Sequence, residues 1–120
     1  MEFKGTPAPW FADIRCGCCA VYQKNRANDT AGCHRDDDRN IVYSSKGARY
    51  DEKLCHWVMD EETQANFTLI AAAPELLESL RELVSAMERY EIDVDERAPV
   101  KHKEMMNKAN SAIAKALGQQ

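Results

Sequence analysis

The side chains with the most reactive chemistry in this chain are cysteines and histidines, and most of them lie in its first half. They are Cys16, Cys18, Cys19, Cys33, Cys55, His34 and His56. Cys33-His34 and Cys55-His56 are adjacent in sequence, but neighbours on a strand point to opposite faces, so neither pair forms a catalytic dyad by itself. The chain also lacks a P-loop, a dinucleotide fingerprint, a nucleophile elbow and a metalloprotease helix. We therefore expect no enzymatic activity.

The same cysteines and histidines are candidate zinc ligands, because thiolates and imidazoles form structural zinc sites and a thin core gains stability from a metal. Their spacing is irregular, since Cys16-x-Cys18-Cys19 is not the usual separated pair and no second clean pair follows. The plainer interpretation makes Cys18 or Cys19 a small buried residue on a strand. The odd number of cysteines and a reducing cytosol favour free thiols or metal ligands over disulfides. We predict no cofactor and leave a structural zinc as the alternative.

Three consecutive acids, Asp36-Asp37-Asp38, are a further candidate for holding a hard cation. They lack the glycine and the downstream glutamate of a calcium-binding loop. The sequence therefore favours a solvated acidic loop.

A third group of residues is suited to binding a flat heterocycle. Trp57 precedes the first helix and Asn66 lies in its early turns, so an indole for stacking and an amide for hydrogen bonding are close in sequence. Phosphates attached to such a ligand require cations. The cationic candidates are Arg15, Arg39, Lys46 and Arg49. In the alternative interpretation Trp57 is ordinary core, Asn66 is a surface amide and the basic residues are solvated.

The elements that position these residues form an α+β fold. Short β-branched and aromatic runs predict an antiparallel sheet of about four strands, at residues 10–15, 18–23, 40–44 and 53–59. Residues 24–38 are expected to form a long loop, and residues 45–51, which contain Gly47, a turn. The β-rich part, residues 1–59, and the helical part, residues 60–120, are expected to form a single domain.

The second half has the apolar periodicity of a helical hairpin. Asp60 is a good N-cap, and Pro74 predicts a kink or a restart in the first helix. The acidic residues 91–99 are expected to form a loop, and the last helix is expected at residues 100–117, stopped by Gly118. The apolar faces of the two helices exceed what a small sheet can cover. We therefore expect a homo-oligomer.

Composition excludes several classes of protein. The net charge of −4 argues against a general nucleic-acid binder and against polybasic membrane attachment. No apolar run approaches the roughly 20 residues needed to span a bilayer, and the first ten residues lack the pattern of a signal peptide. We expect a cytoplasmic protein.

Several motifs resemble those of small bacteriophage and prophage accessory proteins. Lys4-Gly5-Thr6-Pro7-Ala8-Pro9-Trp10 resembles their Thr-Pro-Gly-Pro-Trp opening. Residues 64–80 resemble their characteristic helix, which contains Leu-Ile-Ala-Ala-Ala-Pro-Glu-Leu-Leu-Glu, with Phe67 in place of a smaller residue. Residues 112–118, Ala-Ile-Ala-Lys-Ala-Leu-Gly, are similar to their tail. The resemblance covers most of the chain and implies a phage protein in the host cell cytoplasm.

The layout is also similar to that of the phage sponge proteins that defeat the Thoeris defence system. Those proteins have a sheet followed by helices, form oligomers, and sequester cyclic ADP-ribose signals without cleaving them, and some bind cyclic oligonucleotides. The resemblance implies that Trp57 and Asn66 contact the bases of such a signal. The alternative is an accessory protein that inhibits a host or defence protein by direct contact.

Overall fold

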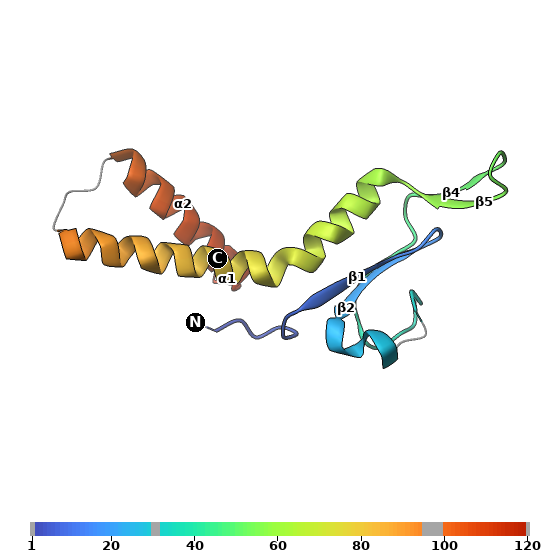
Figure 1. Cartoon of the computed structure of the whole chain (residues 1–120), viewed down its shortest axis with the longest axis horizontal. Helices are drawn as coiled ribbons and strands as arrows, with labels where there is room; N and C mark the ends of the chain where they lie inside the picture. The colour runs from blue at the N-terminus through green and yellow to red at the C-terminus, as the bar shows by residue number, and fades with distance from the viewer. Residues whose placement is uncertain (1, 30–31, 95–99, 120) are drawn as a thin grey trace. The chain divides into compact units, whose positions relative to one another are not determined.

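A computed structural model describes residues 2–29, 32–94 and 100–119 and confirms an α+β architecture (Figure 1). In chain order the elements are β1 (Trp10–Ile14), β2 (Cys19–Gln23), η1 (Lys24–Asp29), β3 (Asn40–Ser44), β4 (Ala48–Asp51), β5 (His56–Met59), α1 (Glu61–Val94) and α2 (Val100–Ala116). The chain divides into two compact units. The strand unit is Thr6–Pro74, and the helical unit is Met1–Gly5 with Glu75–Gln120. Within the described residues, no helix combines the length and apolar character needed to cross a bilayer.

The first sheet of the strand unit has three antiparallel strands in the order β1-β2-β3. Its central strand, β2, pairs along both edges, and its uncharged Cys-Ala-Val-Tyr run is buried at all four positions. The register places Ile14 opposite Cys19 and Cys19 opposite Ser44. The strands expected near residues 10–15, 18–23 and 40–44 are thus confirmed.

A second, two-stranded sheet corrects part of the expected topology. Residues 48–51 form β4 and pair with β5, so the expectation of a turn across residues 45–51 was wrong for residues 48–51. The reversal between β3 and β4 is shorter than expected because Gly47, with φ of +91°, completes it. The expected fourth strand loses its first residues to the β4–β5 turn and begins only at His56. The loop expected at residues 24–38 begins with the 3-10 helix η1.

The core of the strand unit joins the first sheet, the hairpin and the start of α1. Its buried members are Cys19, Val21, Met59 and Phe67, and Ile70 and Ala71 pack against them. Phe67, Ile70 and Ala71 follow the three- and four-residue spacing of one helix face, which α1 turns toward the strands. This packing explains why the first turns of α1 belong to the strand unit.

The helical unit contains the second part of α1 and all of α2. Helix α1 continues through Pro74 without a new start and extends to Val94, so the expectation of a loop from residue 91 was wrong for residues 91–94. Residues 95–99 of that expected loop lie outside the described residues. Helix α2 ends at Ala116, and Gly118, the glycine expected to stop it, follows with φ of +76°. The amides of Gly118 and Gln119 donate to the carbonyls of Lys115 and Ala114, which satisfies the last turn.

Candidate functional site

The corner between β5 and α1 is built around the N-cap residue Asp60. The Asp60 carboxylate accepts a hydrogen bond from the Thr63 amide at 2.8 Å. The Thr63 hydroxyl donates to the Lys46 carbonyl at 3.1 Å, and the Asp60 amide donates to the Gly47 carbonyl at 3.1 Å. The hydrogen bonds from Thr63, with the nearby charges of Arg49 and Lys46, lower the pKa of Asp60. The negative charge of the Asp60 carboxylate therefore balances the partial positive charge at the N-terminus of α1.

An open hollow of about 850 Å³ lies beside this corner in the strand unit. It is bounded by the end of β1, the β4–β5 hairpin and the first turn of α1. Its lining residues are Ile14, Arg15, Cys16, Arg49, Asp51, Leu54, Val58, Met59, Asp60, Glu61 and Gln64. Two of the cations predicted from the sequence, Arg15 and Arg49, are thus brought to one site.

Arg15 is held in place by a hydrogen-bonded network on the sheet. Its Nε donates to the buried Asp13 carboxylate at 2.7 Å, and the Tyr22 hydroxyl donates to the same carboxylate at 2.7 Å. Burial opposes ionisation of Asp13, but the hydrogen bonds from Arg15 and Tyr22 outweigh it and lower the pKa of this carboxyl. A Cβ atom on Gly32 would lie 2.9 Å from the Arg15 guanidinium, so a glycine at this position leaves room for the side chain.

The charges around the hollow are mixed. Arg49 lies 4.0 Å from Asp51, and Asp60 and Glu61 add two more carboxylates to the lining. Arginines bind phosphates well, whereas carboxylates accept hydrogen bonds from hydroxyl groups such as those of ribose. The hollow therefore presents groups for a ligand that has both anionic and hydroxyl-bearing parts.

Trp57 lies on the same hairpin but on its other face. It pairs across the strands with Tyr50, with ring centroids 6.0 Å apart at an edge-on 72°, and each side chain is 52% exposed. Arg49 and Val58, the next cross-strand pair, line the hollow, and side chains alternate between faces along a strand. Trp57 is thus surface rather than core. The sequence pattern does not single out Tyr50, because its partner depends on strand register.

Asn66 is exposed on α1 and is not among the residues lining the hollow. Gln64 lines it instead and donates to the Met59 carbonyl at 3.0 Å. Two residues correspond to about 200° of rotation around a helix, so Asn66 and Gln64 point to different sides. The structure therefore does not bring Trp57 and Asn66 together at this hollow.

The remaining two predicted cations lie apart from the hollow lining. Lys46 is an exposed residue of the β3–β4 turn, near Asp60. Arg39 lines a separate hollow of about 530 Å³ with Asp36, Asp37 and Asp38. Its Nε donates to Asp37 at 3.0 Å, and the backbone and side-chain hydrogen bonds from Arg39 lower the pKa of Asp37. The acidic run thus has its own cationic partner.

The cysteines are arranged differently from the sequence expectation. Cys18 and Cys33 form a disulfide that joins the β1–β2 turn to the loop before β3, which corrects the expectation of free thiols or metal ligands for this pair. Cys19 is the buried strand residue that the sequence suggested, and burial raises the pKa of its thiol. Across residues 2–29, 32–94 and 100–119, no group of three or more His, Cys, Asp or Glu side chains is placed to hold a metal ion.

Comparison with known proteins gives a family. Neither the curated proteins nor the solved structures contain a match to the chain. A family model described as Salmonella phage P22 protein Y8K6 matches residues 1–120, which is the entire sequence. This supports the phage origin inferred from the opening and helix motifs. The chain belongs to the Salmonella phage P22 protein Y8K6 family.

Proposed function

We propose that this phage accessory protein acts by binding and sequestering a nucleotide-derived signal of host defence, without chemistry on it. The observation that carries the proposal is that Arg15 and Arg49 line one hollow together with Asp51 and Glu61. A cyclic ADP-ribose isomer or a cyclic oligonucleotide offers phosphates to the arginines and ribose hydroxyls to the carboxylates. The hollow, about 850 Å³, is within the usual size range of small-molecule sites.

Sequestration requires a site that is formed before the ligand arrives, because ordering costs reduce affinity. Arg15 meets this requirement, since Asp13 holds its guanidinium and Asp13 is itself fixed by Tyr22. Arg49, on β4, is more exposed than Arg15 and supplies a second positive charge to the lining of the hollow. We therefore assign Arg15 to orientation of the ligand and Arg49 to attraction of its phosphates.

The experiment is a binding and release assay with the full-length protein. Isothermal titration is carried out with cyclic ADP-ribose isomers and with cyclic di- and trinucleotides, and the bound ligand is recovered by heating and identified by mass spectrometry. A sponge returns intact ligand in stoichiometric amount. A cleaved product would instead show an enzyme, and the absence of binding to all of these nucleotides would reject the proposal.

A second candidate function rests on a different observation, the exposed Tyr50–Trp57 pair. Aromatic side chains that protrude from a small hairpin are typical anchors at protein–protein contacts. This surface favours inhibition of a host or defence protein by direct contact, and it lies on the opposite face of the hairpin from Arg49. The two candidates are therefore separable by substitution.

A further inference from the structure

The helical unit leaves a row of large apolar side chains uncovered on α1. Leu76, Leu83 and Tyr90 recur every seven residues and are 54%, 59% and 55% exposed. With Leu80 and Met87 between them, they follow the alternating four- and three-residue spacing of a seam between helices. By contrast Val84, which lines the space between α1 and α2, is only 6% exposed. Helix α2 therefore covers only part of the apolar surface of α1.

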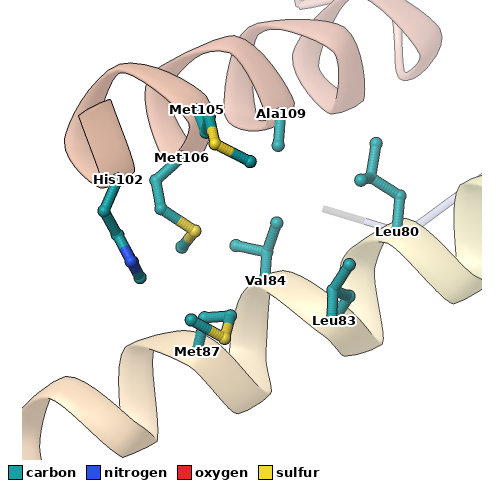
Figure 2. A pocket seen from close by; sticks show the side chains of 8 residues that line it. All are labelled: Leu80, Leu83, Val84, Met87, His102, Met105, Met106 and Ala109. Carbon is teal, nitrogen blue, oxygen red and sulfur yellow. The ribbon is translucent and has the colours of Figure 1, made fainter.

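The space between the two helices is itself open and apolar. A hollow of about 530 Å³ separates them, and in Figure 2 Val84 of α1 and Met106 of α2 point toward one another across it. Its lining residues are Leu80, Leu83, Val84, Met87, His102, Met105, Met106 and Ala109. Leu83 and Met105 line the hollow and yet remain 59% and 63% exposed. An apolar surface of this kind on a soluble domain marks a binding face.

The charges of the helices indicate which occupant fits. From Glu75 to Tyr90, α1 carries four glutamates and two arginines, whereas residues 102–116 of α2 carry three lysines and one glutamate. When two such hairpins pair about a two-fold axis parallel to the helices, the acidic α1 of one copy lies beside the basic α2 of the other. Charges of alternating sign around a four-helix bundle favour this arrangement over a shifted or reversed one.

We propose that this face binds the same face of a second copy, which forms a four-helix bundle with Leu83 and Met105 buried at its centre. A two-fold interface uses one self-complementary surface on both partners, and the row on α1 and the open hollow provide such a surface. The interface concerns the helical unit alone. The proposal of a dimer therefore does not rest on the proposed function, and the two are tested separately.

The test measures the mass of the full-length protein by light scattering after size-exclusion chromatography, over a wide range of concentrations. The wild type is expected at twice the 13.6 kDa of one chain. Leu83→Glu is expected to give the single-chain mass with unchanged helical circular dichroism. Ser85→Glu is the matched control, because it adds the same charge to an exposed position about 200° further around α1, and it is expected to remain dimeric.

The remaining outcomes also test the proposed dimer. A wild type at the single-chain mass at every concentration overturns the proposal, and so does a Leu83→Glu variant that stays dimeric. If Leu83→Glu loses helical signal, Met105→Glu on α2 provides the same test at a side chain that is 63% exposed. Native mass spectrometry that finds one chain with a small apolar molecule would overturn the proposal in favour of a ligand site.

Discussion

The backbone amide of Asp60 donates a hydrogen bond to the carbonyl oxygen of Gly47 across 3.1 Å, so the turn before β4 lies directly against the start of α1. A Cβ atom on Gly47 would lie 2.6 Å from the Asp60 carboxylate and 2.6 Å from the Thr63 hydroxyl. Gly47 also has φ of +91°, a conformation that residues with a side chain rarely adopt. One glycine therefore permits both the reversal between β3 and β4 and the N-cap of the helix.

Replacing Gly47 with alanine is expected to lower the free energy of unfolding by about 2 kcal/mol, because the new methyl group displaces the cap and strains the turn. Urea unfolding followed by circular dichroism measures this change. Gly17→Ala is the matched control, since a Cβ atom there would meet nothing within 4 Å. Equal stability of the two variants would show that Gly47 does not hold this corner together.

Tyr22→Phe is expected to destabilise the strand unit by about 1 kcal/mol at neutral pH, because it removes one of the three side-chain hydrogen bonds that the buried Asp13 carboxylate accepts. The pKa of Asp13 is lowered in the folded protein, so its contribution to stability is present above the unfolded pKa and disappears as the pH falls through the folded pKa. Loss of the Tyr22 hydroxyl raises the folded pKa and reduces that contribution.

The two proteins are therefore expected to converge in stability as the solution becomes acidic, with Tyr22→Phe showing the shallower decline. Chemical denaturation at a series of pH values below neutral measures both slopes. Tyr43→Phe on β3 is the control, because its hydroxyl takes no part in the Asp13 network. A gap between wild type and Tyr22→Phe that stays constant down to strongly acid pH would contradict this assignment.

Arg49→Ala is expected to weaken binding of a nucleotide signal by at least about tenfold, since a charge-assisted hydrogen bond to phosphate contributes on the order of 1.5–3 kcal/mol. The fold is expected to be unaffected, because the side chain is exposed and its ion pair with Asp51 is long, at 4.0 Å. Arg35→Ala is the control, because Arg35 is similarly exposed, pairs with Asp36 and does not line the hollow. Isothermal titration that finds equal affinity for both variants would reject the hollow as the phosphate site.

Trp57→Ala is expected to cost less than about 1 kcal/mol in stability, because the indole is half exposed and forms an edge-on pair with the exposed ring of Tyr50. Phe67→Ala, the same kind of truncation in the core, is expected to cost about 3–5 kcal/mol. If the aromatic pair recognises a protein, Trp57→Ala abolishes that contact and Arg49→Ala does not. Nucleotide binding that falls with Trp57→Ala as strongly as with Arg49→Ala would instead place the indole at the ligand.

Local interactions explain the parts of this structure that can be predicted from the sequence. The N-cap at Asp60 and the glycine stop at Gly118 each depend on neighbours within a few residues, and both are present. The α+β class follows from the change in periodicity near Asp60. The family motifs are also linear, which is why the phage origin could be inferred without coordinates.

Tertiary structure decided everything that depends on strand register and on contacts between distant segments. The pairing of Tyr50 with Trp57, and the face each occupies, depends on which residues of β4 and β5 lie opposite one another. The Cys18–Cys33 disulfide, and the hollow that Arg15 and Arg49 both line, depend on segments separated by loops, whose closure no local pattern encodes. Strand register and rotation around a helix decide which face each side chain occupies, so sequence spacing could not show that Trp57 and Asn66 lie away from the hollow that Arg15, Arg49 and Gln64 line.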